Sequence, residues 1–146
     1  MKLIIGNLLY QQGTLLQVVN DRKLMGAGLA KQIADRWPNV KDIYLRSNTR
    51  LGQCDLIVVE PKVRVANLYA QRGINSGLVP HHRRLNYGYL AQALRELSVA
   101  NGADSQVYVP YQMGCGLAMG NWSIVFEILT VYFPDAIIVQ RPEDKP

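Results

Sequence analysis

The apolar residues of this chain recur with two different periods, and the two alternate along the sequence. Short apolar runs rich in β-branched residues predict buried strands, and apolar residues three and four positions apart predict helices. The predicted strands are residues 2–5, 15–20, 55–60, 63–69, 106–110 and 136–140. The predicted helices lie within residues 26–37, 40–45, about 82–100 and 122–132. Strands that alternate with helices predict an α/β domain with a largely parallel sheet covered on both faces.

One pair of strands departs from this alternation. Only Pro61 and Lys62 separate residues 55–60 from residues 63–69, which predicts a hairpin and therefore an antiparallel element in a mixed sheet. No repeat, linker or low-complexity segment divides the chain, and 146 residues is the length of an ordinary domain. We expect a single domain over residues 1–146.

Two glycine-containing loops each follow a predicted strand and precede a predicted helix. They are residues 25–29 and residues 113–117. Ligands of parallel sheets bind at the carboxyl ends of the strands, so both loops are expected at the same edge. Their backbone N–H groups could hold a pyrophosphate between them. Taken singly, either loop is equally consistent with a tight turn that serves only packing.

The charge of the chain adds one consideration about partners. The chain has sixteen Lys and Arg residues and eleven Asp and Glu residues, so its formal net charge is +5, which suits an anionic ligand. The charges are scattered, however, and the only cluster is residues 81–84, two histidines followed by two arginines. Because nucleic-acid binders tend to gather basic and aromatic residues on one face, we do not expect a nucleic-acid partner.

Several classes of protein are not expected from the composition. The chain is 49% hydrophobic and 18% charged, as globular domains are. No apolar run approaches the length of a membrane span, and the amino-terminal stretch is too short for a signal peptide, so we expect a cytoplasmic protein. We also expect a monomer. Cys54 and Cys115 lack the spacing of metal ligands, and we expect reduced thiols, no metal and no cofactor.

The order of several short motifs resembles that of the macrodomains. These motifs are Gly6-Asn7-Leu8-Leu9, Val19-Asn20, Met25-Gly26-Ala27-Gly28-Leu29-Ala30, Ala66-Asn67-Leu68, and Pro110 followed by Gly114-Cys115-Gly116-Leu117. The likeness is greatest to the branch with ADP-ribose 1''-phosphate phosphatases, hydrolases of carboxylate-linked ADP-ribose, antitoxins that remove ADP-ribose from DNA, and small phage-borne macrodomains. The resemblance implies a three-layer α/β/α fold that binds ADP-ribose across the rim of the sheet.

The same resemblance implies which residues contact the ligand. The loops Met25-Gly26-Ala27-Gly28-Leu29 and Gly114-Cys115-Gly116-Leu117 would hold the pyrophosphate and the distal ribose by backbone N–H groups. Asn20 falls at the asparagine that contacts the distal ribose. Asn7, followed by Leu8, falls where many members have an aspartate that accepts a hydrogen bond from the adenine amino group. An amide oxygen accepts that bond less strongly than a carboxylate does.

The chain departs from the family at the positions that carry its chemistry. Gln71 stands where hydrolase members have a lysine beside the ligand, and Ala118 where they have an aspartate. Gln17 stands where phosphatase-like members have a histidine. Because Gln and Ala can act neither as nucleophile nor as base, those mechanisms are not open to this chain.

Two groups remain as candidates for catalysis beside Asn20, which would orient the ribose. Asp21 follows Asn20 directly, and its carboxylate could activate a water molecule, or it could simply hydrogen-bond the nearby backbone. His81 and His82 could supply an acid, or they could begin a surface helix.

Two hypotheses about function follow. In the first, the protein binds ADP-ribose or a close derivative and hydrolyses a terminal phosphate or an ester bond at the distal ribose. In the second, it is a binding module without turnover, either a reader of ADP-ribosylation or a sink for a signalling nucleotide derived from ADP-ribose. The residues Gln71 and Ala118 favour the second hypothesis, and Asp21 favours the first.

Overall fold

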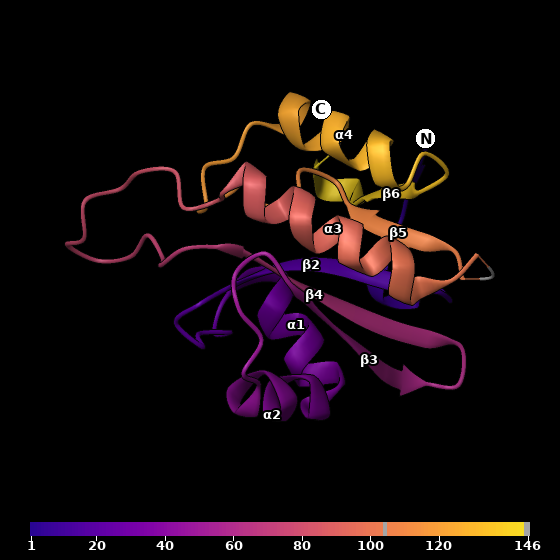
Figure 1. The fold of residues 1–146 in the computed structure, drawn as a ribbon, viewed down its shortest axis with the longest axis horizontal. Coiled ribbons are helices and arrows are strands. Elements are labelled where there is room, and N and C mark those ends of the chain that lie inside the picture. The colour runs from indigo at the N-terminus through magenta and orange to yellow at the C-terminus, as the bar shows by residue number, and fades with distance from the viewer. Residues whose placement is uncertain (104, 145–146) are drawn as a thin grey trace.

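The computed structural model describes residues 1–103 and 105–144 (Figure 1). Strands and helices alternate along the chain as the apolar periods predict. Their order is β1 (Lys2–Ile5), η1 (Leu8–Tyr10), β2 (Thr14–Asn20), α1 (Gly28–Arg36), α2 (Pro38–Arg46), β3 (Cys54–Glu60), β4 (Val63–Gln71), α3 (Tyr87–Asn101), β5 (Val107–Pro110), α4 (Trp122–Tyr132), β6 (Ile137–Gln140) and η2 (Pro142–Asp144).

The strands form one six-stranded sheet in the order β1-β6-β5-β2-β4-β3. Neighbouring strands are parallel, with the exception of β3, which pairs antiparallel with β4. The predicted hairpin and the predicted mixed, largely parallel sheet are therefore confirmed. Because β1, β6, β5, β2 and β4 run the same way, their carboxyl ends share one edge of the sheet.

Helices cover both faces of this sheet and give three layers (Figure 1). Strand β2 shows how the sequence divides between the faces, because alternate side chains of a strand point to opposite sides. Leu15 and Val19 belong to the apolar core shared with α1 and α2, whereas Leu16 belongs to the core shared with α3 and α4. The expected α/β/α architecture is confirmed.

The expectation that a long helix begins near residue 82 is wrong. Helix α3 begins at Tyr87, and Asn86 caps it by accepting a hydrogen bond from the Tyr89 N–H at 2.9 Å. Leu85 has the spacing of a helical residue, but it forms a β-bridge with Gln71 and its side chain is buried in the core shared with α3 and α4. His81 therefore lies in a loop and does not begin a helix.

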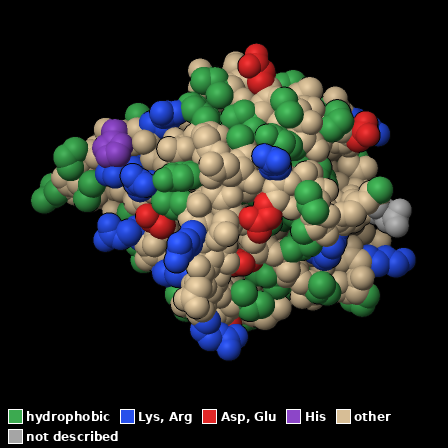
Figure 2. Space-filling model, in the orientation of Figure 1, with side chains coloured by type: hydrophobic (Ala, Val, Ile, Leu, Met, Phe, Trp, Pro, Cys, Tyr) green, Lys and Arg blue, Asp and Glu red, His purple; other side chains and the backbone are tan. Residues whose placement is uncertain are grey.

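Residues 72–86 form that loop, which projects from one end of the molecule (Figure 1). Its tip is open to solvent, and Leu78 is fully exposed. Figure 2 shows Lys or Arg side chains and a histidine side chain over this end of the molecule. Arg72 and Arg83 of the loop stack on Tyr89 and Tyr87, which fixes the base of the loop to the start of α3.

No helix within the described residues is both long and apolar enough to cross a membrane.

Candidate functional site

A cavity of about 650 Å³ opens at the carboxyl edge of the sheet. Its wall is built by the loops that follow β1, β2, β4, β5 and β6. The lining includes Asn7 and Leu8, residues 24–30, residues 74–76, residues 110–114 and 116–118, Arg141 and Asp144. The two glycine loops thus face the same cavity, as their positions after parallel strands predict.

Asn20 organises the first loop from the end of β2. Its side-chain Oδ1 accepts hydrogen bonds from the N–H groups of Arg22 at 2.9 Å and Leu24 at 3.3 Å, and its Nδ2 donates to the Leu24 carbonyl at 2.8 Å. These bonds close residues 20–24 into a turn, and the chain leaves that turn along the cavity wall. Asn20 itself also lines the cavity.

The same turn is anchored on the carboxyl end of α2. Lys23 has a positive φ of 60°, and its Nζ donates to the carbonyl oxygens of Tyr44 at 2.9 Å and Ser47 at 2.7 Å. A cation is favoured there because the last carbonyls of a helix carry partial negative charge. The hydroxyl of Tyr44 donates to the Asn20 carbonyl at 2.5 Å and lies 3.0 Å from its side-chain oxygen.

Stability at alkaline pH tests this anchor. Burial raises the pKa of Tyr44 from 10.0 to about 12. The unfolded chain therefore ionises first, so the contribution of Tyr44 is complete below pH 10 and is lost as pH rises to about 12. Over this range we expect the wild type to lose about 2 kcal/mol more unfolding free energy than Tyr44→Phe.

Urea unfolding of both proteins at several pH values measures this difference. Cys54, whose pKa burial also raises to about 12, titrates in both proteins and cancels in the comparison. Equal losses in the two proteins would contradict the assignment.

The first loop presents backbone donors to the cavity. Among the described residues, the N–H groups of Gly26, Ala27, Gly28, Leu29 and Ala30 have no hydrogen-bond acceptor within the chain. Those of Gly28 to Ala30 are the first donors of α1, where the helix dipole also favours negative charge. Gly28 has a φ of 59°, which glycine adopts without strain. This arrangement suits a phosphate group.

The second glycine loop lines the same cavity. Within the part of the chain that the structure describes, the N–H groups of Gly114, Gly116 and Leu117 also lack an acceptor. Gly114 has a φ of 74°, and a Cβ at this position would lie 3.0 Å from the side chain of Leu85. The absence of a side chain at Gly114 therefore lets the loop pack closely on Leu85 in the core beneath it.

Cys115 does not take part in this arrangement. Its N–H donates to the Gln112 carbonyl at 2.9 Å, and it does not line the cavity. Its Sγ lies 3.4 Å from the carbonyl of Met113, and burial raises the pKa of the thiol to about 11. The expected ligand contact of Cys115 stays a prediction, and the structure places its side chain against the core shared with α3 and α4.

Asn75 joins the projecting loop to the second glycine loop. Its Nδ2 donates to the carbonyls of His82 at 2.7 Å and Leu117 at 2.8 Å, and its Oδ1 accepts from Arg84 Nε at 3.0 Å. The side chain is buried and lines the cavity. The sequence offered no signal for this residue, since it lies in a segment without a recognisable period.

Asp21 lies outside the cavity lining and is exposed. Its Oδ1 accepts a hydrogen bond from the Gly73 N–H at 2.8 Å, and its own N–H donates to the Gln71 carbonyl at 3.1 Å. Of the two roles considered for this carboxylate, the geometry shows the local one, which ties the first loop to the segment after β4. Gln71 lines the cavity, and its Nε2 donates to the Gly73 carbonyl at 3.1 Å.

Gln17 contributes a neutral amide to the cavity wall. It is buried, lines the cavity, and donates from Nε2 to Asn67 Oδ1 on the neighbouring strand at 2.7 Å. The end of the cavity near Asn20 is likewise lined by neutral polar side chains, Gln71, Asn75 and Ser76. Neither His81 nor His82 lines the cavity. Within the described residues, no lining side chain at this end is a general acid or base.

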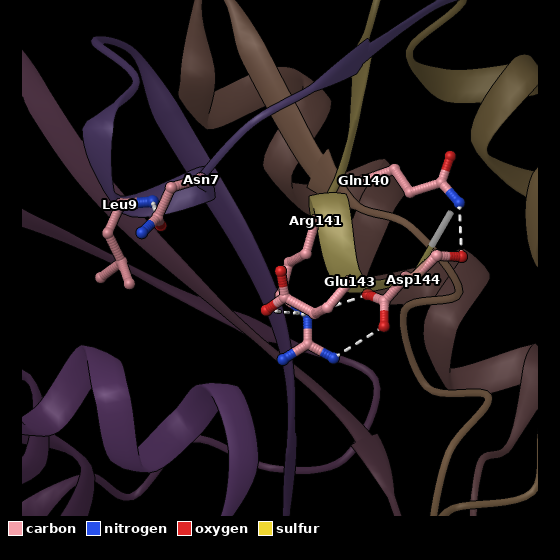
Figure 3. A network of polar contacts seen from close by, with 6 residues as sticks. All are labelled: Asn7, Leu9, Gln140, Arg141, Glu143 and Asp144. Atoms are coloured by element: carbon pink, nitrogen blue, oxygen red, sulfur yellow. Dashed lines mark hydrogen bonds and ion pairs between the residues drawn. The ribbon is translucent and has the colours of Figure 1, made fainter. Parts of the chain in front are cut away.

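The opposite end of the cavity holds Asn7, Arg141 and Asp144 (Figure 3). Asn7 caps the short helix η1, because its Oδ1 accepts a hydrogen bond from the Leu9 N–H at 2.9 Å. The Arg141 guanidinium forms two hydrogen bonds to the Asp144 carboxylate, at 2.8 and 2.9 Å. This contact lowers the pKa of Asp144. Sequence reasoning missed Arg141 and Asp144, which follow the last strand without a motif.

The described residues contain no cluster of three or more His, Cys, Asp or Glu side chains that could bind a metal ion.

Comparison with known proteins identifies the fold. No model of a known protein family matches the chain, and no curated protein sequence does. Among solved structures, a protein from Bacteroides thetaiotaomicron aligns with a TM-score of 0.82 at 23% identity, over 97% of this chain and 99% of the other. A macrodomain protein from Streptomyces coelicolor aligns with a TM-score of 0.76 at 23% identity, over 95% and 97%.

A third structure contains a ligand. It is DarTG of Thermosipho africanus in complex with ADP-ribose, which aligns with a TM-score of 0.72 at 21% identity over 99% of this chain and 42% of the other. These likenesses show that the chain has the macrodomain fold.

Proposed function

We propose that this chain, which has the macrodomain fold, binds ADP-ribose or a close derivative in the cavity at the carboxyl edge of its sheet. The observation that carries the proposal is the pair of facing loops whose backbone N–H groups lack acceptors within the described chain. Such groups stabilise the negative charge of a pyrophosphate without a lysine or a metal ion. The ADP-ribose complex of a protein with the same fold supports the choice of ligand.

The two ends of the cavity suit the two ends of this nucleotide. Within the described residues, Asn20 keeps one Nδ2 hydrogen and Gln71 keeps its Oε1, and these groups can hydrogen-bond the hydroxyl groups of the distal ribose. The adenine would lie at the other end, beside Asn7 and Leu8, where the resemblance to macrodomains places it. A cavity of about 650 Å³ is large enough for a ligand of this size.

Binding without rapid turnover is the form of this function that the site favours. Hydrolysis at the distal ribose needs a group that activates water, and the lining side chains at that end are neutral. We therefore favour a reader of ADP-ribosylation or a sink for a nucleotide derived from ADP-ribose. Hydrolysis of ADP-ribose 1''-phosphate or of ester-linked ADP-ribose is the second candidate, and the observation in its favour is that Asp21 directly follows Asn20, which lines the cavity.

Calorimetric titration with ADP-ribose tests binding, with AMP as the control. We expect ADP-ribose to bind more tightly than AMP, because AMP has neither the second phosphate nor the distal ribose. Equal affinity for both nucleotides, or no heat with either, would contradict the proposal. Phosphate release from ADP-ribose 1''-phosphate on the same sample then measures turnover.

Replacing Asp21 by alanine separates the two candidate functions. We expect Asp21→Ala to weaken ADP-ribose binding by less than about tenfold, because only one hydrogen bond to Gly73 is lost outside the cavity. If the wild type releases phosphate and this variant does not while still binding ADP-ribose, the hydrolase is the correct function and the pure binding module is wrong.

A further inference from the structure

The loops after β1 and β6 begin side by side. Ile5 is paired with Gln140 in the sheet, and the Gly6 N–H donates to the Gln140 carbonyl at 2.9 Å. Asn7 and Arg141 follow directly on neighbouring strands, and both line the cavity (Figure 3). This end of the cavity is therefore built jointly by η1 and η2.

A fixed ion pair lies at this end. The Nε and Nη2 atoms of Arg141 contact the Asp144 carboxylate at 2.8 and 2.9 Å, a two-point geometry that holds the guanidinium plane. Gln140 Nε2 donates to the Asp144 carbonyl at 3.0 Å, which fixes the backbone of η2. Among the described residues that line the cavity, these two side chains alone carry charge.

Asp144 is the strongest hydrogen-bond acceptor at this end. Asn7 is neutral, and its Oδ1 already accepts the Leu9 N–H. A carboxylate has about four acceptor positions, and the two bonds from Arg141 leave the others open. The Asp144 side chain is 36% exposed, so a ligand can reach it.

We propose that the Arg141–Asp144 pair selects the base of the nucleotide. The Asp144 carboxylate accepts a hydrogen bond from the exocyclic amino group of adenine, and the Arg141 guanidinium covers a face of the ring. Hypoxanthine has a carbonyl oxygen in place of that amino group, so two acceptors would face each other. This inference rests on the proposed function and assigns its base specificity.

The test compares ADP-ribose with inosine diphosphate ribose by calorimetry. We expect the wild type to bind ADP-ribose at least about tenfold more tightly. In Asp144→Asn the ratio of the two dissociation constants should fall below about threefold, because an amide can accept a hydrogen bond from adenine or donate one to hypoxanthine. Glu143→Gln is the matched control, since Glu143 lies 3.7 Å from Arg141 but does not line the cavity, and its ratio should equal that of the wild type.

A second variant tests the role of the guanidinium plane. Arg141→Lys keeps the positive charge and removes the planar guanidinium group. We therefore expect it to weaken the binding of both nucleotides by a similar factor. A ratio in Asp144→Asn that equals the wild-type ratio would overturn the inference while the proposed function stands. If the wild type binds neither nucleotide, the proposed function itself fails.

Discussion

Gly26→Glu is expected to weaken ADP-ribose binding by at least about a hundredfold while the fold stays intact. Gly26 lines the cavity, and a Cβ at this position would meet no atom within 4 Å, so the side chain has room on the folded protein. A glutamate there would occupy the space of the ligand and place a negative charge beside the pyrophosphate. Calorimetry measures the affinity, and circular dichroism with thermal unfolding checks the fold.

Gly26→Ala is the control for this substitution. A methyl group brings no charge and little volume, so its effect should be far smaller than that of glutamate. A Gly26→Glu variant that is folded and binds ADP-ribose as the wild type does would exclude this cavity as the binding site.

Leu85→Ala is expected to lower the unfolding free energy by about 3 kcal/mol. Leu85 is buried in the core shared with α3 and α4, and Gly114 packs directly on its side chain. Its N–H also donates to the Ala118 carbonyl at 3.1 Å, so the residue lies beneath the second glycine loop. A cavity at this position removes support from that loop, and we expect ADP-ribose affinity to fall as well, by about tenfold.

Leu78→Ala provides the comparison, because Leu78 belongs to the same loop and is fully exposed. Urea unfolding should show no loss for Leu78→Ala. If both variants were equally stable, the packing of Leu85 under the second loop would be wrong.

The sequence predicted the architecture well because the apolar periods are set by burial within each element. The strand at residues 15–20 and the antiparallel pair joined by Pro61 and Lys62 were both predictable from local pattern. The start of α3 was not. Leu85 has the spacing of a helical residue, but it lies outside the helix, in a β-bridge to Gln71 and packed in the core by contacts distant in sequence.

In the candidate site too, residues with a local sequence signal were predictable, and residues placed by other contacts were not. The glycine loops were predictable, because a glycine between a strand and a helix carries its own local signal. Asn75 and Asp144 were not, since no local pattern marks their side-chain contacts, which are the Leu117 carbonyl on another loop for Asn75 and the Arg141 guanidinium three residues earlier for Asp144. The contact of Asp21 was not predictable either, because Gly73, whose N–H donates to the Asp21 carboxylate, lies 52 residues away in sequence.

Binding of the pyrophosphate by the two glycine loops can be tested with the backbone amide spectrum of ¹⁵N-labelled protein during titration with ADP-ribose. We expect the largest shifts at the amides of Gly26, Gly28, Leu29, Gly116 and Leu117, whose N–H groups lack acceptors in the described chain. Asn101, at the carboxyl end of α3 and absent from the cavity lining, should not shift. If the amides of both loops did not shift and the shifts lay elsewhere on the molecule, the two loops would not be the binding site of the pyrophosphate.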